Sequence, residues 1–107
     1  MNNYFVDAND LVAVMEEVAS LKSLYYSLGR ALNLKTADLR AIRNAFPSES
    51  DAELALEDVL LLWLNQKYDV EIHGRPTWKM LVKAVDMKSG GNDHELAERI
   101  ALNHPAG

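Results

Sequence analysis

Apolar residues recur along the chain at the three- and four-residue intervals of amphipathic helices, with polar residues between them. Capping residues, glycines and prolines divide this pattern into segments. Six helices are therefore expected, over residues 8–19, 20–33, 36–46, 52–68, 76–87 and 92–104. The residues predicted to face inward are Leu11, Val14, Met15, Val18, Leu21, Leu24, Tyr25, Leu28, Ala31, Leu32, Leu39, Ile42, Phe46, Leu56, Val59, Leu60, Trp63, Trp78, Leu81, Val82, Val85, Leu96, Ala97, Ile100 and Ala101.

Several polar residues and one proline mark where these helices begin and end. Asp7, Thr36 and Asn92 are candidate N-caps, because their side-chain oxygens accept bonds from the unpaired N–H groups of a first helical turn. The third helix is expected to stop at Phe46, since a residue that precedes proline is pushed out of helical geometry. Residues 69–75 alternate between polar and apolar types but have no partner strand, so we expect them to form a loop.

The fourth predicted helix, residues 52–68, carries more apolar residues than one buried face requires. Its apolar run, residues 59–64, passes more than once around the helix axis, since each residue advances by about 100°. Leu54 and Leu61 consequently fall on the side opposite the predicted core positions. Either a neighbouring helix covers both leucines, or they form an apolar centre within an acidic rim. We expect them to be covered.

No stretch of the chain offers a credible pair of strands, and no repeat or linker divides it. Helices joined by short connections predict an all-α bundle with antiparallel neighbours. A length of 107 residues fits one domain, which we expect to span residues 1–107. Gly29, inside the second helix, costs about 1 kcal/mol relative to alanine, so we expect it to permit close helix packing.

Composition and charge limit the classes of function. The chain is 49% apolar and 25% charged, which is typical of a globular protein, and it has no cysteine for a disulfide or a thiolate metal site. Its formal charge of −5 argues against general binding to nucleic acid or anionic membranes, both of which need a basic surface. We see no signal peptide and no apolar run near the roughly 20 residues of a membrane span. The sequence thus predicts a soluble, cytoplasmic protein without membrane insertion.

The titratable and nucleophilic residues do not form a recognisable catalytic or metal-binding motif. His73, His94 and His104 fall in a predicted loop, a helix start and the C-terminal segment, and none has a metal-binding partner at i+3 or i+4. Residues 94–98 resemble a zinc-protease helix but lack its second histidine. We therefore expect no catalytic residues, no metal and no cofactor, and we predict that the protein is not an enzyme.

Charged side chains are distributed unevenly among the predicted helices. Basic residues gather on the second and third helices, and acidic residues gather on the first and fourth. A surface divided in this way favours head-to-tail docking with copies or relatives of the same protein. The alternative is that these side chains only solvate the helices. The residues concerned are Arg30, Lys35, Arg40 and Arg43 on one side, and Asp7, Asp10, Glu16, Glu17, Glu49, Asp51, Glu53, Glu57 and Asp58 on the other.

Four motifs stand out in the predicted helices, and they are residues 25–34 for the second helix, 39–47 for the third, 60–63 for the fourth, and 76–85 with 91–100 for the fifth and sixth. Taken in order, they resemble the motifs of the death domains of the death-fold superfamily. The match covers residues of about 9–104. The chain departs from the family by having Tyr25 where tryptophan is usual, and by a longer loop over residues 69–75.

The resemblance implies a six-helix bundle with Greek-key topology that binds other death domains, without catalysis or a cofactor. Family assemblies are built from asymmetric contacts, one of which pairs the first and fourth helices of one domain with the second and third of another. On that basis the expected partner-binding residues are Arg40, Arg43, Asp38, Glu16, Glu17, Glu53, Glu57 and Asp58.

The resemblance also implies an adaptor or receptor module in intracellular signalling of the apoptotic or innate-immune kind. Its partners would be copies of itself or related death domains, and such contacts allow oligomeric assembly. The alternative class of function is a small helical nucleic-acid-binding module, although the charge of −5 predicts no binding to nucleic acid.

Overall fold

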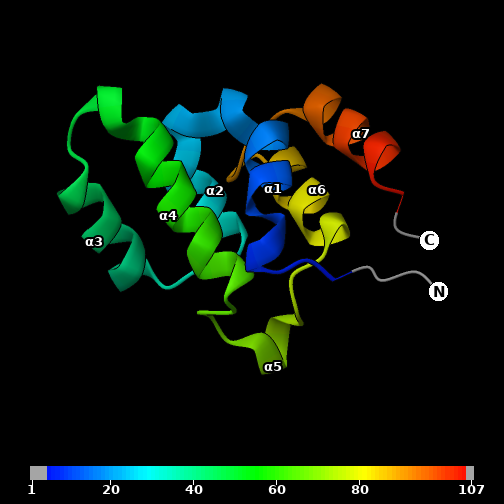
Figure 1. Cartoon of the computed structure of the whole chain (residues 1–107), viewed down its shortest axis with the longest axis horizontal. Helices are drawn as coiled ribbons and strands as arrows, with labels where there is room; N and C mark the ends of the chain where they lie inside the picture. Colours follow the sequence, from blue (N-terminus) through cyan, green and yellow to red (C-terminus); the bar gives the residue numbers. More distant parts are fainter. Residues whose placement is uncertain (1–4, 106–107) are drawn as a thin grey trace.

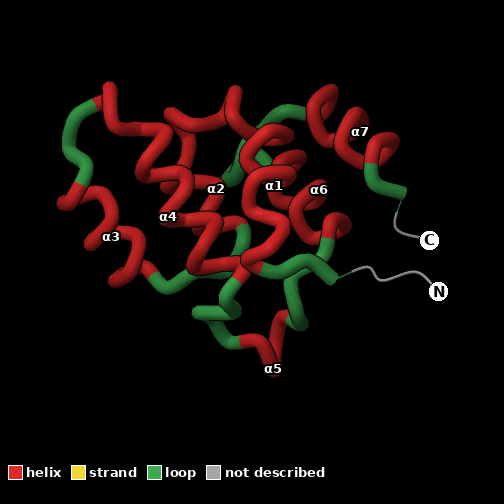
Figure 2. The backbone as a smooth tube through the Cα atoms, viewed as in Figure 1, coloured by secondary structure: helices red, strands yellow, loops and turns green. Residues whose placement is uncertain are grey.

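A computed structural model of the chain describes residues 5–105, and almost all of its regular structure is helical (Figures 1 and 2). The α-helices are α1 (Leu11–Val18), α2 (Tyr25–Ala31), α3 (Thr36–Ala45), α4 (Ala52–Leu64), α5 (Val70–His73), α6 (Trp78–Asp86) and α7 (His94–Asn103). Segments of 3₁₀ helix lead directly into α1, α2 and α4; they are Ala8–Asp10, Ala19–Leu24 and Glu49–Asp51. Among the described residues the single strand-like feature is an antiparallel bridge between Phe5 and Thr77.

The prediction of an all-α fold is confirmed. Within residues 5–105 there are six helices of seven residues or more, as predicted, and the four-residue α5 in addition. The Cα radius of gyration is 12.8 Å, which matches the value of about 13 Å expected of one compact domain of this length. The first four and last two residues of the predicted domain lie outside the described residues.

The long helix α4 runs through the middle of the molecule (Figure 1). It packs against α1, α2 and α3, while α6 packs against α7 and also touches α2. α5 forms a separate turn at the bottom of the view, between α4 and α6. α3 and α7 lie at opposite ends of the bundle (Figure 1).

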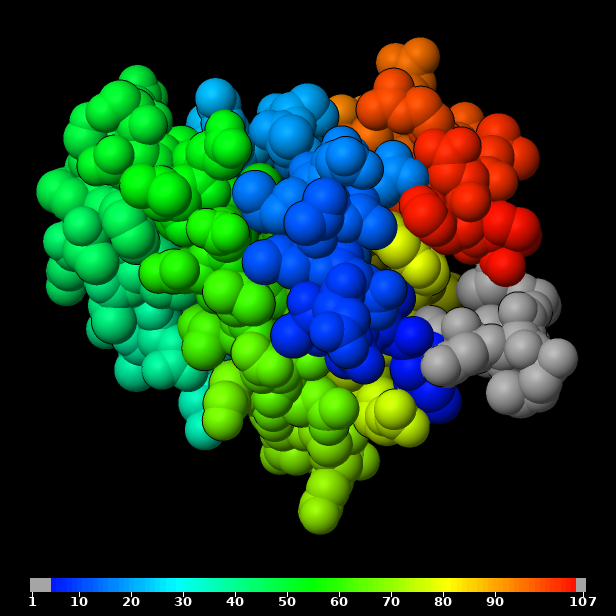
Figure 3. All heavy atoms as spheres, viewed as in Figure 1, coloured from blue at the N-terminus to red at the C-terminus, as the bar shows by residue number. Residues whose placement is uncertain are grey.

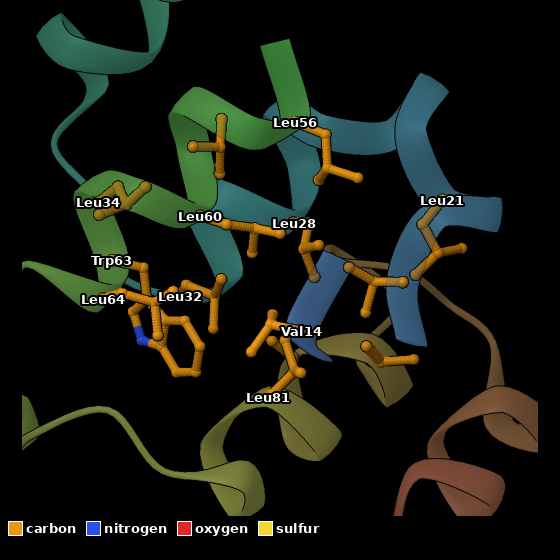
Figure 4. Close-up of a cluster of buried hydrophobic side chains, with 14 of the residues drawn as sticks. Val14, Leu21, Leu28, Leu32, Leu34, Leu56, Leu60, Trp63, Leu64 and Leu81 are labelled. Carbon is orange, nitrogen blue, oxygen red and sulfur yellow. The ribbon is translucent and has the colours of Figure 1, made fainter. Parts of the chain in front are cut away.

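The inner face of α4 forms the centre of the core. Leu56, Val59, Leu60 and Trp63 are all fully buried, as the sequence predicts. Figure 4 shows Leu56, Leu60 and Trp63 in one apolar cluster that also contains Leu28 of α2, Val14 of α1 and Leu81 of α6. Burying one such side chain contributes about 1.5–3 kcal/mol. α4 therefore provides much of the stabilisation that holds the other helices in place.

Two glycines allow close approach between elements. A Cβ atom on Gly29 of α2 would lie 2.5 Å from Leu39 Cδ2 of α3 and 3.2 Å from Val59 Cγ1 of α4. The predicted packing role of Gly29 is therefore confirmed. Gly90, between α6 and α7, is buried, and a Cβ atom there would collide with the carbonyl oxygen of Ala84. Both positions lack room for a side chain.

Two helices begin differently from the prediction. Asp93, not Asn92, caps α7, and its carboxylate accepts a hydrogen bond from the Leu96 N–H at 3.0 Å. Asn92 instead has a left-handed conformation, with a φ of 50°, in the preceding turn. At α3 the N-cap position is Lys35, which makes no side-chain cap bond, and Thr36 is the first helical residue. Both predicted caps are wrong by one position.

α4 is shorter than predicted, and a short helix follows it. α4 ends at Leu64 in a Schellman motif, in which Gln66 has a φ of 60° and the Lys67 N–H donates to the Leu62 carbonyl at 2.9 Å. The left-handed residue turns the chain away from the helix axis. The loop predicted over residues 69–75 contains α5, so that prediction is wrong at its centre.

Most residues predicted to face inward are buried or half-buried. One exception is Leu24, which is 40% exposed because the 3₁₀ segment before α2 breaks the α-helical period at Leu21. The other is Ala101, which is exposed on α7. The expectation that a neighbouring helix covers the outer leucines of α4 is wrong for Leu54, which is 50% exposed, while Leu61 is half-buried.

Candidate protein-interaction surface

Two arginines define one side of α3. Arg40 and Arg43 are one turn apart, and both are exposed. The Arg43 guanidinium carbon lies 4.6 Å from the ring centroid of Tyr26 on α2, so this side of α3 faces α2. A cation–π contact at an exposed site contributes about 0.5–1 kcal/mol and orients the guanidinium. We call Arg40 and Arg43 the arginine flank.

Acidic residues of α1 and α4 are the second group of charged side chains. Glu16 of α1 and Glu53 of α4 are exposed, and Glu57, one turn after Glu53, is half-buried. α1 and α4 pack against each other and lie side by side on the face shown in Figure 3, whereas α3 lies at the left edge of that face. We call Glu16, Glu53 and Glu57 the acidic flank.

Neither flank is neutralised by a salt bridge to an opposite charge of the same chain. Within residues 5–105 no lysine or arginine lies within 4.0 Å of an acidic side chain, and the close acid–base pairs there involve His94 or His104. Unpaired surface charges are available to another molecule. Between molecules, electrostatic complementarity raises the association rate and selects the partner.

Glu17 is set apart from the acidic flank by contacts with the C-terminal end of α7. Its carboxylate oxygen lies 2.6 Å from His104 Nε2 and accepts a hydrogen bond from Asn103 Nδ2 at 3.2 Å. The Glu17 side chain is only 15% exposed. The His104 ring also stacks on Trp78, with 3.6 Å between the ring centroids. These contacts hold α1, α6 and α7 together, and no local sequence pattern reveals them.

Asp38 and Asp58 line a groove between α3 and α4 that contains no residue of either flank. The groove has a volume of about 350 Å³, and we call it the α3–α4 groove. Asp38 is separated from Arg40 by about 160° around α3, since two residues advance about 200°. The two residues therefore do not share a surface. The groove is lined by Asp38, Ala41, Ile42, Asp58, Leu61, Leu62, Asn65 and Lys67.

Other titratable groups make contacts between neighbouring elements. His94 Nδ1 lies 2.9 Å from Asp86 Oδ1, and this hydrogen bond, with the charges of Asp86 and Glu98, raises the pKa of His94. Burial raises the pKa of the Tyr68 hydroxyl, which donates to the Gly74 carbonyl at 2.7 Å and so ties the end of α5 to the loop that precedes it. The described residues contain no group of three or more histidine and acidic side chains placed to hold a metal ion.

Within the described part of the chain, no helix has the length and apolar character needed to cross a membrane. Comparisons with protein-family models, with curated proteins and with solved structures found no match. The function is therefore inferred from the two charged flanks and the α3–α4 groove.

Proposed function

We propose that the chain is a death-domain-like protein-interaction module, in which the arginine flank of one molecule binds the acidic flank of another. The observation that carries the proposal is that the two flanks have opposite charge and are not neutralised within residues 5–105. Because the flanks differ in position as well as in sign, the contact is asymmetric and repeats from one molecule to the next. The partner in this contact is a second copy of the chain or a related death domain with flanks of opposite charge.

The packing of α1 against α4 supports this interpretation, because acids of two different helices then contribute to one surface. The resemblance to death domains implies that the first and fourth helices together form one side of such a contact. We extend the proposal to a Greek-key order of the six longer helices and to a cytoplasmic adaptor or receptor module in signalling. These properties accompany the death-domain contact in the family.

Exposed apolar residues beside the acids give the contact more than charge. A single exposed ion pair contributes only about 0.2–1 kcal/mol, so a stable complex needs apolar contact as well. Leu54 is 50% exposed and follows Glu53 directly, and Val12 is 70% exposed one turn before Glu16. A charged surface with exposed aliphatic side chains has the mixed composition of a non-obligate interface.

Charge reversal on the arginine flank tests the proposal. We expect Arg40→Glu or Arg43→Glu to abolish association, measured by sedimentation velocity for self-association and by pull-down for a panel of death domains. Helical content, measured by circular dichroism, should not change because both side chains are exposed, and melting should fall only slightly in Arg43→Glu, which loses the contact with Tyr26. Lys88→Glu is the control, since it makes the same charge change at an exposed site in the turn between α6 and α7. Wild-type association of both arginine variants would rule out the arginine flank.

A charge swap asks whether the two flanks meet each other. Glu53→Arg alone should also prevent self-association. An equimolar mixture of Arg40→Glu and Glu53→Arg molecules should recover it, because each variant then faces a surface of opposite charge. If the two variants fold but the mixture stays monomeric, the arginine flank does not bind the acidic flank.

A further inference from the structure

The outer side of α4 carries a continuous stripe of residues beside α3. Leu54, Asp58, Leu61 and Asn65 are spaced at i, i+4, i+7 and i+11, which places them on one face of the helix and its C-cap. At 1.5 Å per residue the stripe is about 16 Å long, or three helical turns. The last three of these residues line the α3–α4 groove. The stripe thus has the length of a short helix laid along it.

The floor of the groove is apolar, and part of it lies outside the core. Ile42 belongs to the buried core and Leu62 packs against that core. Leu61, which also lines the groove, is half-buried and stands outside the core cluster. Ala41 is small and exposed, which leaves the groove open on the side of α3. The volume of about 350 Å³ lies at the lower end of the range for ligand pockets, about 300–1,000 Å³.

Negative charge borders this apolar floor from both helices. Asp38 lies in the first turn of α3 and Asp58 near the middle of α4, and neither has a lysine or arginine within 4.0 Å. Lys67 is the one base among the residues that line the groove, and Asn65 adds an amide. A suitable occupant therefore combines a large apolar side chain with a cation about one turn away from it.

We propose that the α3–α4 groove docks an amphipathic basic helix of a partner protein. The partner helix places a large apolar side chain against Leu61 and Ile42, and it directs arginine or lysine side chains at Asp38 and Asp58. Arginine fits best, because its planar guanidinium binds a carboxylate through two hydrogen bonds. Docking of an amphipathic helix into an apolar groove is a common mode of protein recognition.

Two helices of the chain itself, α6 and α7, suit the groove less well. α7 presents Leu102, which is 81% exposed, but Glu95 and Glu98 lie on the same face and would be repelled by the two aspartates at the rim. α6 presents Lys79 and Lys83, but its apolar residues are buried or half-buried in its own molecule. Charge complementarity and exposure therefore favour a basic helix from another protein over a second copy.

A labelled peptide tests the groove directly. The probe is a fluorescein-labelled helical peptide of roughly 12 residues, or three turns, with a central leucine, an arginine one turn to each side and alanine elsewhere. Binding to the whole chain is measured by fluorescence anisotropy. We expect Leu61→Ser, and separately the double variant Asp38→Asn with Asp58→Asn, to weaken binding about tenfold, since they remove the apolar floor and the rim charge. A peptide with glutamate in place of arginine should not bind.

Matched variants distinguish the groove from general attraction to an acidic protein. Glu95→Gln with Glu98→Gln removes the same charge from α7 and should leave peptide binding unchanged. Undiminished binding by the groove variants, or no binding by the folded wild type, would overturn the proposal. So would a dimer of the wild-type chain that Leu61→Ser dissociates, because the occupant would then be a second copy.

The groove proposal does not depend on the homotypic contact. Arg40→Glu changes the opposite side of α3, so it should prevent association between copies without weakening peptide binding. Loss of peptide binding in Arg40→Glu would contradict the assignment of the site to the α3–α4 groove.

Discussion

Neighbouring leucines of α4 face two different environments. Leu60 is fully buried in the core, whereas Leu61 is half-buried and lines the α3–α4 groove. The inner face of α4 holds the bundle together, and the outer face keeps apolar side chains that the bundle does not cover. Hydrophobicity alone therefore does not distinguish a residue that stabilises the fold from one that is available to a partner.

The acidic residues differ in the same way. Glu17 on α1 is 15% exposed and pairs with His104, while Glu57 on α4 is half-buried and has no lysine or arginine within 4.0 Å. One glutamate fastens α7 to α1, and the other belongs to the acidic flank. The two glutamates differ in role because Glu17 has a basic partner within the chain and Glu57 does not.

The largest difference in stability is expected between alanine variants of Leu60 and Leu61. Leu60→Ala should lower the free energy of unfolding by about 3 kcal/mol, because it removes buried methyl groups and leaves a cavity. Leu61→Ala should cost less than about 1 kcal/mol, since the groove already exposes part of the side chain to water. Urea denaturation followed by circular dichroism measures both values. Equal destabilisation would mean that Leu61 belongs to the core.

A smaller difference in stability is expected between alanine variants of Glu17 and Glu57. Glu17→Ala should destabilise the fold by about 1–2 kcal/mol, because it removes a charged hydrogen-bond acceptor from His104 and Asn103. Glu57→Ala should change stability by less than about 0.5 kcal/mol and should weaken association between copies. The same denaturation series, with sedimentation of each variant, separates the two effects. A stable, non-associating Glu17→Ala would assign that residue to the acidic flank instead.

The smallest expected effect is a change of stability with pH that depends on His94. Its hydrogen bond to Asp86, followed by the charges of Asp86 and Glu98, raises its pKa above the ordinary value of 6.5. A raised pKa in the folded state stabilises the fold fully below pH 6.5, and this stabilisation is lost as the pH rises through the folded-state pKa. The melting temperature should therefore fall slightly between pH 6 and pH 8, and less in His94→Gln. Parallel pH profiles for wild type and variant would exclude this contribution.

The parts of the fold that follow from local patterns could be predicted from the sequence. The buried face of α4 repeats with the period of a helix, and Asp7 caps the first turn by accepting a hydrogen bond from the Asn9 N–H at 2.9 Å. Gly29 was recognisable because glycine in the middle of a helix is costly unless space requires it. In each case the residues that determine the outcome lie within a few positions of one another.

Features that depend on contacts between residues far apart in the sequence, or on elements too short to show a period, could not be predicted. The Glu17–His104 pair joins residues 87 positions apart, so the periodicity of neither helix reveals it. α5 is too short to show a period, and it forms because the N–H groups of Ile72 and His73 both reach the Asp69 carbonyl. A helical wheel shows which residues of α4 face away from the core, but it does not show how much of that face α3 covers.

Local sequence patterns likewise predict only part of the candidate site. The spacing of Asp38 and Arg40 within one helix already separates them around its axis, but only the structure shows that Asp38 lines a groove. The arrangement of α3 beside α4 then brings Asp38 and Asp58 to one rim. Assigning charges to surfaces therefore needs the packing of two helices, which residue spacing within one helix does not contain.

The lack of lysine or arginine salt bridges within residues 5–105 has a consequence for how the protein responds to dissolved ions. At an ionic strength of about 0.1 M, exposed charges further apart than a Debye length of about 10 Å are largely screened. Inside the described fold there is no lysine or arginine salt bridge for salt to weaken, whereas the proposed contacts between molecules begin with the attraction between oppositely charged surfaces. Ionic strength should thus control how often the protein meets its partners while leaving its own architecture unchanged.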